Sequence, residues 1–262
     1  MNNEPEWSLI TVTYNSAPAL RQFWQSGGPP SWCEWIVVDN ASSDNTPGVA
    51  RDLGAKVIEN GRNVGFGRAN NRGYTNASAE RVGFINPDVT VDYSSLRRIS
   101  STVDDRSALV APQLLNSDGS LQPNGRGTPS LANKIAHRIN PDSVDGSYRV
   151  FAAPKEHRPV VFLIGAVVLG HRSVFDRLGT RGPWNERYFI YYEDSDLGLR
   201  ARALGIDNLV IGSERWVHGW ARETSGLRLR PWAREVSSMV KFYSAHPRML
   251  FRLPDISLSH WW

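Results

Sequence analysis

The 262-residue sequence contains one cysteine, Cys33, and no long hydrophobic run. A single cysteine cannot form an internal disulfide or supply several thiolates to a zinc ion, which favours a reducing compartment. No apolar run approaches the ~18–20 residues that span a membrane. The first six residues, Met-Asn-Asn-Glu-Pro-Glu, lack the basic and apolar segments of an export signal. We therefore expect a globular protein of the cytoplasm.

Several motifs for nucleotide binding and nucleophilic catalysis are missing. The Walker pattern Gly-x-x-x-x-Gly-Lys-Ser/Thr does not occur, which argues against a P-loop NTPase. The Gly-x-Ser-x-Gly elbow of serine hydrolases is absent as well. Gly65 and Gly67 lack a third glycine and follow the third predicted strand rather than the first. This placement argues against a nicotinamide or flavin enzyme.

Lysine is scarce, since only four of the 30 Lys and Arg residues are lysines. The formal net charge is +4, and the basic residues alternate with 26 Asp and Glu residues. A concentrated basic stripe is lacking, so we expect no nucleic-acid partner. Arginine suits bidentate recognition of phosphate, although a general preference for arginine explains the count equally well.

The first hundred residues alternate between strand and helix patterns. Short β-branched runs end in turn residues, and each is followed by a segment with helical spacing or a capping residue. This alternation predicts βαβ units and a mostly parallel sheet, in which ligands bind beyond the carboxyl ends of the strands. The predicted strands are 8–13, 35–38, 56–59 and 82–85, and the predicted helices are 17–26, 49–53 and 65–77.

The second half is less regular. Residues 122–159 are rich in Pro, Gly, Asn and charge, which is typical of a functional loop, with one short helix predicted at 131–139. An apolar run at 160–169 is interrupted by Gly165. The other predicted elements are a strand at 108–112, a hairpin turn at 116–119, a helix at 193–203, a strand at 206–211 and a helix at 231–244.

Asp88 follows a predicted strand and Pro87. Because the proline fixes its own backbone and extends Asn86, the side chains of Asn86 and Asp88 can leave the sheet edge in the same direction. Such oxygen ligands bind Mg²⁺ or Mn²⁺ when substrate phosphates complete the coordination. The alternative is an Asn-Pro-Asp turn stabilised by its own side-chain hydrogen bonds.

A second carboxylate cluster, Glu193, Asp194 and Asp196, opens the predicted helix after the aromatic run 189–192. Crowded carboxylates beside aromatic rings can raise the pKa of one of them, which suits a general base. A solvated helix terminus is the alternative. His218 lies a few residues after a predicted strand, where a histidine serves as a ligand or as a structural residue.

The ten tryptophans offer flat faces on which a sugar could stack. A place in the hydrophobic core is the alternative for each. The three tryptophans best placed for stacking are Trp184, Trp216 and Trp220.

Taken in order, these segments resemble the family 2 inverting glycosyltransferases of the GT-A fold, especially their bacterial rhamnosyltransferase-like branch. The resemblance covers about residues 7–225. The matching segments are 11–15 (TVTYN), 36–44 (IVVDNASSD), 63–67 (NVGFG), 70–73 (NNRG), 84–88 (FINPD), 114–123 (LLNSDGSLQP), 165–166 (GA), 184–197 (WNERYFIYYEDSDL) and 217–218 (VH).

The resemblance implies an α/β protein with a mostly parallel, Rossmann-like central sheet, flanked by helices, and an irregular acceptor-side half. Residues 1–225 would form the glycosyltransferase domain, with a donor half at about 7–112 and an acceptor half at about 113–225. Residues 226–262 would form a C-terminal helix and tail packed on the same domain.

Site residues also follow from the resemblance. It implies contacts to a nucleotide-sugar donor from Thr13, Tyr14, Asn15, Asp39, Asn63, Gly65, Arg68, Asn70, Asn86 and Asp88. It implies Asp194 as catalytic base with Glu193 and Asp196 in support, and an acceptor site near Gly165, Ala166 and Trp184. It implies Mn²⁺ or Mg²⁺ bound by Asp88 and His218. Asn86 departs from the Asp-x-Asp pattern, so the metal would rest mainly on Asp88 and the donor diphosphate.

The implied reaction transfers a sugar from dTDP-rhamnose or a UDP-hexose to an acceptor hydroxyl, with inversion in a single displacement. The acceptor stays open: a glycan, a lipid-linked glycan, a protein or a small molecule. A second interpretation is a catalytically inactive GT-A domain that binds carbohydrate or a partner. We expect a lid at 224–230. The tail at 253–262 either packs on the domain, touches the inner face of a membrane or contacts a second subunit in a homodimer.

Overall fold

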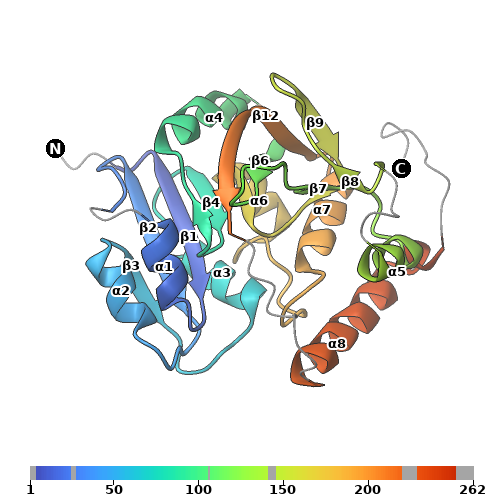
Figure 1. Cartoon of the computed structure of the whole chain (residues 1–262), viewed down its shortest axis with the longest axis horizontal. Helices are drawn as coiled ribbons and strands as arrows, with labels where there is room; N and C mark the ends of the chain where they lie inside the picture. Colours follow the sequence, from blue (N-terminus) through green and yellow to red (C-terminus); the bar gives the residue numbers. More distant parts are fainter. Residues whose placement is uncertain (1–3, 25–27, 106, 141–145, 220–228, 252–262) are drawn as a thin grey trace.

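The computed structural model describes residues 4–24, 28–105, 107–140, 146–219 and 229–251. Within them, nine strands form one sheet in the order β3-β2-β1-β4-β11-β6-β12-β5, with β9 paired to β12 (Figure 1). The strands are β1 (Trp7–Thr13), β2 (Cys33–Asp39), β3 (Lys56–Glu59), β4 (Arg81–Ile85), β5 (Val89–Thr90), β6 (Ala108–Leu115), β9 (His157–Val160), β11 (Val167–His171) and β12 (Asp207–His218).

A smaller sheet and the helices complete the fold. Figure 1 shows α5 and α8 together at the end of the molecule opposite β3. The small sheet has the order β10 (Phe162–Leu163), β7 (Gly125–Arg126) and β8 (Arg149–Val150). The helices are α1 (Ala17–Phe23), α2 (Thr46–Asp52), α3 (Phe66–Tyr74), α4 (Tyr93–Asp105), α5 (Leu131–Ile139), α6 (Arg172–Leu178), α7 (Glu193–Ala203), α8 (Leu229–Ala245) and the 3₁₀-helix η2 (Pro247–Leu250).

The main sheet is mostly parallel, as the sequence predicts. Strands β3, β2, β1, β4, β6 and β12 run in one direction, and β11 lies antiparallel between β4 and β6. Since β11 and β12 come from the second half of the chain, the predicted donor and acceptor halves share one sheet. Their carboxyl ends therefore bring polar residues from both halves to one edge.

The predicted elements are found with shifted ends. The helix predicted at 49–53 begins earlier, at Thr46, and the helix predicted at 65–77 ends at Tyr74. The apolar run at 160–169 is divided among β9, β10 and β11. Helices α4 and α6 were not predicted. In α4 the buried residues Leu96, Ile99 and Val103 have helical spacing, but the Ser- and Arg-rich residues between them mask the pattern.

Tryptophans fill much of the core. Trp24 and Trp35 stack with ring centroids 3.8 Å apart. The indole N–H of Trp35 donates to Thr11 and that of Trp216 donates to Ser95, so these two buried indole nitrogens are paired. Trp216 is thus a core residue rather than a sugar-stacking face, and Trp220 lies outside the described residues.

The C-terminal helix α8 packs on the segment that precedes α7. Its aromatic residues Phe242 and Tyr243 form a buried cluster with Tyr188 and Tyr192, and Met249 of η2 joins them. Among the described residues, no helix combines the length and the hydropathy needed to cross a membrane. The predicted tail at 253–262 and most of the predicted lid at 224–230 fall outside those residues.

Candidate active site

A buried hydrogen bond joins the carboxyl ends of β1 and β2. Thr13 Oγ1 donates to Asp39 Oδ1 across 3.0 Å, and the backbone N–H of Asn40 donates to the Thr13 carbonyl. The other carboxylate oxygen of Asp39 accepts the backbone N–H of Ser42 at 2.8 Å. Two of the predicted donor-binding residues are therefore held in fixed positions at the ligand-binding edge of the sheet.

The turn after β1 is tied to the turn after β2. Asn15 has a left-handed backbone with φ of 53°. Its N–H donates to Ser42 Oγ, and its Oδ1 accepts the N–H of Ser43 at 2.7 Å. These hydrogen bonds fix the backbone after Thr13, and the neighbouring Tyr14 side chain is exposed beside the Thr13–Asp39 pair.

The start of α3 contacts the segment before α7 directly. Gly65 has φ of +91°, and a Cβ there would lie 2.6 Å from the carbonyl oxygen of Phe189, so only glycine fits. The N–H of Phe66 donates to that same carbonyl at 2.8 Å. Asn63 Oδ1 accepts the N–H of Gly65 at 3.0 Å and shapes the turn.

Two predicted donor-binding residues of α3 differ in their surroundings. The exposed Arg68 pairs with Glu186, with Nε 2.9 Å from Oε2. Asn70 is buried, and its Nδ2 donates to the carbonyl of Phe66 within the same helix. Arg68 can therefore change partners when a ligand arrives, whereas Asn70 already bonds to its own helix.

Asn71 was not predicted, and it anchors the segment before α7. Its Nδ2 donates to the Trp184 carbonyl at 2.8 Å, and its Oδ1 accepts the Trp184 N–H at 3.0 Å. The Trp184 ring is buried and packs edge-on against Phe66 and Phe84 at 5.3 and 5.4 Å between centroids. It lies in the core, and its role at an acceptor stays a prediction.

Residues 165–166 connect the end of β4 to the start of α7. The N–H of Asn86 donates to the carbonyl of Ala166 at 2.9 Å. A Cβ on Gly165 would lie 3.9 Å from the Cβ of Asp194. The strand end that leads to Asp88 and the acidic start of α7 therefore share these two small residues as neighbours, and the role of Gly165 and Ala166 at an acceptor stays a prediction.

Asp88 and His218 meet because β5 pairs with the end of β12. Asp88 Oδ1 lies 3.3 Å from His218 Nε2, and both side chains are largely buried. The other ring nitrogen, Nδ1, lies 2.7 Å from Gln122 Oε1. Since the Gln122 amide nitrogen donates to Asn116 at 3.0 Å, its oxygen is the acceptor and Nδ1 carries the proton. The opposite ring nitrogen, Nε2, therefore faces a carboxylate oxygen of Asp88.

Glu193 is a buried carboxyl group in the acidic cluster. Among the described residues, its Oε2 has no hydrogen-bond partner. Burial, together with the charge of Asp194, raises the pKa of Glu193 to about 8. The group therefore holds its proton at neutral pH and can donate a hydrogen bond.

Asp194 is held through one oxygen. Its Oδ1 accepts the N–H of Ser195 at 2.6 Å and the Ser195 hydroxyl at 3.1 Å. Lys134 of α5 in turn donates from Nζ to Ser195 Oγ at 2.9 Å, above the rings of Phe162 and Tyr192. Within the described residues, Oδ2 accepts no hydrogen bond. Sequence patterns gave no indication of Ser195 or Lys134.

Asp196 is engaged within the protein. Its Oδ1 accepts from the Tyr188 hydroxyl and pairs with His246 Nε2 at 2.9 Å, and its Oδ2 accepts from Arg200 at 2.7 Å. Burial opposes ionisation of this carboxyl group, but the hydrogen bond from His246 and the charge of Arg200 outweigh it and lower the pKa of Asp196. These contacts fasten the end of α8 to α7.

The chain is similar to known glycosyltransferases in sequence. It is 29% identical over 240 residues to an N-acetylglucosaminyl-diphospho-decaprenol L-rhamnosyltransferase of Mycobacterium tuberculosis, a match that covers 82% of this chain and 76% of that protein.

Solved structures share the fold. A mannosyltransferase from Pyrobaculum calidifontis, in complex with GDP-Man and Mn²⁺, superposes with a TM-score of 0.60 at 18% identity and covers 94% of this chain. TarS 1–349 of S. aureus, in complex with UDP-GlcNAc, gives 0.57 at 15% identity and covers 93%. This chain spans 65% of each of those two chains. The predicted GT-A fold is confirmed.

The family model described as glycosyl transferase family 2 matches residues 8–179, which is more than half of the chain. These residues contain the Thr13–Asp39 pair, the Gly65 turn and Asp88. The chain therefore belongs to glycosyl transferase family 2.

Proposed function

We propose that the protein transfers a sugar from a nucleotide-diphosphate sugar to an acceptor hydroxyl with inversion, and that Asp194 is the general base. The observation that carries this proposal is the asymmetry of the Asp194 carboxylate. Ser195 occupies Oδ1 through two hydrogen bonds, whereas Oδ2 accepts none among the described residues. A carboxylate fixed at one oxygen and open at the other is prepared to accept a proton at the open one.

A small residue lies close to Asp194. A Cβ on Gly165 would already lie 3.6 Å from the ring of Phe66 and 3.9 Å from the Cβ of Asp194, so the glycine keeps larger side chains away from the proposed base. Glu193, which keeps its proton at neutral pH, adds no second negative charge to repel the ionised Asp194.

The donor nucleotide would lie at the carboxyl ends of β1, β2 and β4. Thr13, Asp39 and Asn15 form a fixed polar surface there, with the exposed ring of Tyr14 beside it. GDP-Man and UDP-GlcNAc in the two structural neighbours support a nucleotide sugar as the donor class. The rhamnosyltransferase relative supports dTDP-rhamnose, with UDP-hexoses as the alternative.

The residues present fit a divalent cation. Asp88 Oδ1 and His218 Nε2 face each other 3.3 Å apart, and Gln122 accepts from the far ring nitrogen and orients the ring. Carboxylate and imidazole ligands suit Mn²⁺, and Mg²⁺ and Mn²⁺ commonly share their coordination with substrate phosphates. A cation held there would neutralise the charge that develops on the departing diphosphate. The Mn²⁺ bound in the Pyrobaculum neighbour supports this assignment.

An Asp194→Asn variant tests the assignment of the base. The amide keeps the size of the side chain but cannot take a proton, so we expect sugar transfer to fall by about 10²–10⁴-fold. Binding of the nucleotide sugar, measured by isothermal titration calorimetry, should persist. Asp105→Asn, at the exposed end of α4, is the matched control and should keep full activity. Near-normal transfer by Asp194→Asn would overturn the proposal.

The acceptor is a hydroxyl group of a sugar in this proposal. The M. tuberculosis relative is named for a sugar linked through a diphosphate to decaprenol, which supports a lipid-linked glycan as the acceptor class. An assay that offers lipid-linked and free glycans side by side decides between these acceptors.

A further inference from the structure

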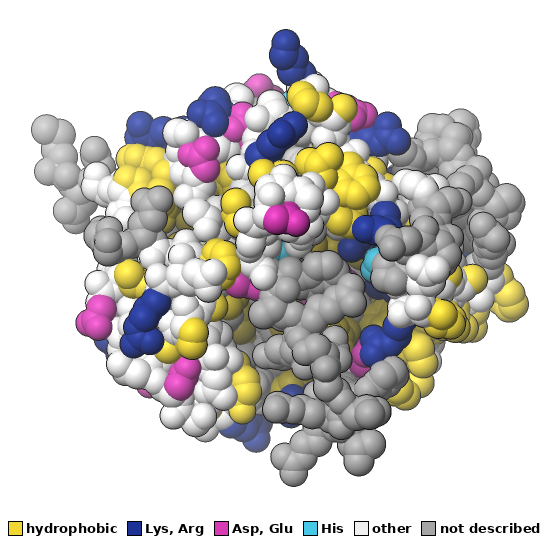
Figure 2. Space-filling model, in the orientation of Figure 1, with side chains coloured by type: hydrophobic (Ala, Val, Ile, Leu, Met, Phe, Trp, Pro, Cys, Tyr) yellow, Lys and Arg dark blue, Asp and Glu magenta, His cyan; other side chains and the backbone are white. Residues whose placement is uncertain are grey.

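Large hydrophobic side chains are exposed together at one corner of the molecule. Among the described residues, several of the most exposed large hydrophobic side chains belong to α5, α8, η2 and the residue after η2. In Figure 2 hydrophobic side chains gather at the lower right, where Figure 1 places α5 and α8. We call this set the C-terminal corner, and it consists of Ile135, Ile139, Val236, Val240, Leu250 and Phe251.

The corner is continuous because its elements contact one another. Arg138 of α5 forms an ion pair with Glu235 of α8 at 2.7 Å. The hydroxyl of Tyr243 in α8 donates to the carbonyl of Pro129, just before α5. Met249 of η2 packs into the same aromatic cluster as α8. The exposed side chains therefore belong to one rigid surface and not to separate loops.

Helix α5 has two faces with different chemistry. Lys134 points inward, where its Nζ donates to Ser195 beside the proposed base. Ile135 and Ile139 lie one turn apart on the other face, and Ile139 is 80% exposed. The same helix thus contacts the candidate active site on one side and presents apolar side chains to the surroundings on the other.

Helix α8 repeats this arrangement. Phe242, Tyr243 and Ser238 face the protein, and Ser238 Oγ donates to the carbonyl of Ile190. Val236 and Val240 lie one turn apart on the outer face, and Val240 is 58% exposed. A helix in a soluble domain normally presents charged or polar residues there.

Positive charge surrounds these apolar side chains. Among the described side chains of α5, α8 and η2, the basic residues outnumber one acidic residue, Glu235, which is already paired with Arg138. The exposed basic residues are Arg138, Arg234, Lys241 and Arg248, whereas Lys134 points inward. Apolar side chains with basic residues around them are typical of a helix that lies in the interface of an anionic membrane.

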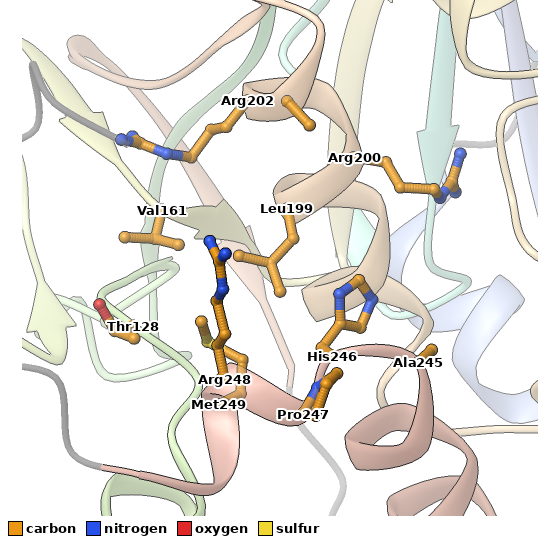
Figure 3. A pocket seen from close by; sticks show the side chains of 11 residues that line it. Thr128, Val161, Leu199, Arg200, Arg202, Ala245, His246, Pro247, Arg248 and Met249 are labelled. Atoms are coloured by element: carbon orange, nitrogen blue, oxygen red, sulfur yellow. The ribbon is translucent and has the colours of Figure 1, made fainter. Parts of the chain in front are cut away.

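A cavity of about 410 Å³ adjoins the corner between α7 and η2. Its lining combines the apolar Leu199, Val161 and Met249 with the guanidinium groups of Arg202 and Arg248. In the view of Figure 3, Arg248 extends between Val161 and Leu199 toward the side of Arg202. Two guanidinium groups above an apolar floor suit a phosphate that carries a hydrocarbon chain.

We propose that the C-terminal corner docks on the surface of an anionic phospholipid bilayer, with a lipid phosphate bound by Arg248 and Arg202. A bilayer fits this surface better than a protein partner does, because the apolar side chains are spread over two helices and a turn and the basic residues around them outnumber the single acidic residue, Glu235. Burying Ile139 and Phe251 among the lipid head groups removes apolar area from water, and the basic residues add attraction to anionic lipid.

Docking would bring the candidate active site to the lipid surface. Lys134 adjoins Ile135 in sequence and contacts Ser195, which holds the proposed base Asp194. A sugar carried on a membrane lipid would therefore reach the acceptor side without leaving the bilayer. This second step rests on the proposed function, whereas the docking itself does not.

Vesicle binding tests the docking without donor, acceptor or metal. The full chain is sedimented with vesicles of phosphatidylcholine containing about 30% phosphatidylglycerol and with vesicles of phosphatidylcholine alone. We expect binding to the anionic vesicles, weakened by salt, and little binding to the neutral ones. The double variant Ile139→Ser/Phe251→Ser should bind about tenfold more weakly. Arg248→Gln should lose much of the preference for the anionic lipid.

The matched control is Leu204→Ser, which removes an exposed apolar side chain at the end of α7, away from the corner. It should bind vesicles as the unchanged protein does. Three outcomes would each overturn docking. The double variant could bind vesicles as tightly as the unchanged protein does. The unchanged protein could bind neutral and anionic vesicles equally, or it could fail to bind anionic vesicles. A dimer that the double variant dissociates, without an effect on vesicles, would assign the corner to a second copy. Loss of sugar transfer in Asp194→Asn with intact vesicle binding would separate the two proposals.

Discussion

Nε2 of His218 lies 3.3 Å from Oδ1 of Asp88, although four described helices, the small sheet and the strands β5, β6, β9 and β11 lie between the two residues along the chain. Gln122 orients the ring through its opposite nitrogen, at 2.7 Å. The three side chains come from β12, the turn after β4 and the segment after β6, and the pairing of β5 with β12 brings the first two together.

The orientation of His218 by Gln122 can be tested through metal affinity. Gln122→Leu removes the acceptor that keeps the ring proton on Nδ1, so we expect Mn²⁺ affinity to fall by about 10–100-fold. Binding is measured by electron paramagnetic resonance of free Mn²⁺ in the presence of a nucleoside diphosphate. Gln122→Glu keeps an acceptor and should retain most of the affinity. Equal Mn²⁺ binding by Gln122→Leu would remove the metal assignment from this histidine.

Lys134 is a positioning residue in the proposed mechanism because it acts on Asp194 through Ser195. Burial favours the neutral amine, but the acidic groups around it, Tyr148 and Asp194 among them, outweigh this effect and raise the pKa of Lys134. We expect Lys134→Met to lower kcat about tenfold and leave the KM for the donor unchanged, since the hydrogen bond to Ser195 is lost.

A structural defect in Lys134→Met would instead lower its thermal stability or raise its KM for the donor. Lys155→Met, on an exposed loop, is the control and should match the unchanged protein. Thermal unfolding of both variants is followed alongside their steady-state kinetics. A Lys134→Met protein with a normal kcat, or one whose donor KM rises in step with the fall in kcat, would contradict the positioning role.

Glu193 makes the stability of the protein depend on pH. Its pKa rises from an ordinary 4.5 to about 8 in the folded protein, so the folded state binds more protons than the unfolded chain between these values. The stabilisation from this group is complete below about pH 4.5 and is lost as the pH rises through about 8. As the pH rises, the free energy of unfolding of Glu193→Gln should therefore increase relative to that of the unchanged protein, by at most ~1.4 kcal/mol per pH unit.

Urea unfolding at about pH 5, 6, 7 and 8 measures the difference in free energy of unfolding between the variant and the unchanged protein. The exposed Glu59→Gln variant is the control, because its ion-pair partner is Arg51 rather than a histidine, and its offset from the unchanged protein should be nearly constant with pH. A constant offset for Glu193→Gln as well would show that Glu193 does not hold its proton in the folded protein.

Gly65 offers a test of the contact between α3 and the segment before α7. A Cβ at this position would meet the Phe189 carbonyl oxygen at 2.6 Å and would have to adopt φ of +91°. We expect Gly65→Ala to lower the free energy of unfolding by about 1–3 kcal/mol. Gly61→Ala is a matched control four residues earlier, where a Cβ meets no atom within 4 Å, and it should change stability little. Similar midpoints for both variants in urea would contradict the steric argument.

The sequence predicts the parallel part of this fold well. Strands such as 8–13 and 82–85 are short apolar runs bounded by turn residues, and their alternation with helices leaves little choice of topology. The meeting of Thr13 with Asp39 follows from this topology, because both residues end neighbouring parallel strands. Asp88 and Asp194 could be singled out because they stand where the matching family motifs place carboxylates.

Other parts of the candidate site could not be predicted. Lys134 lies in the predicted helix 131–139, but no periodicity shows that it will contact Ser195. Asn71 bonds to the backbone of Trp184, a contact that depends on the shape of a loop rather than on residue type. The engagement of Asp196 by His246 likewise depends on how α8 packs against α7. Such contacts are decided by tertiary packing between elements far apart in sequence.

The family model ends at residue 179, yet β12 begins at Asp207 and lies inside the main sheet. It is hydrogen-bonded to β6 along most of its length and carries His218 at its end. A polypeptide cut near residue 179 would expose the backbone edge of β6, which favours aggregation. Recombinant work on this enzyme should therefore keep the chain through β12. A fragment limited to the residues that the family model matches would lack both a strand of the main sheet and His218, the partner of Asp88.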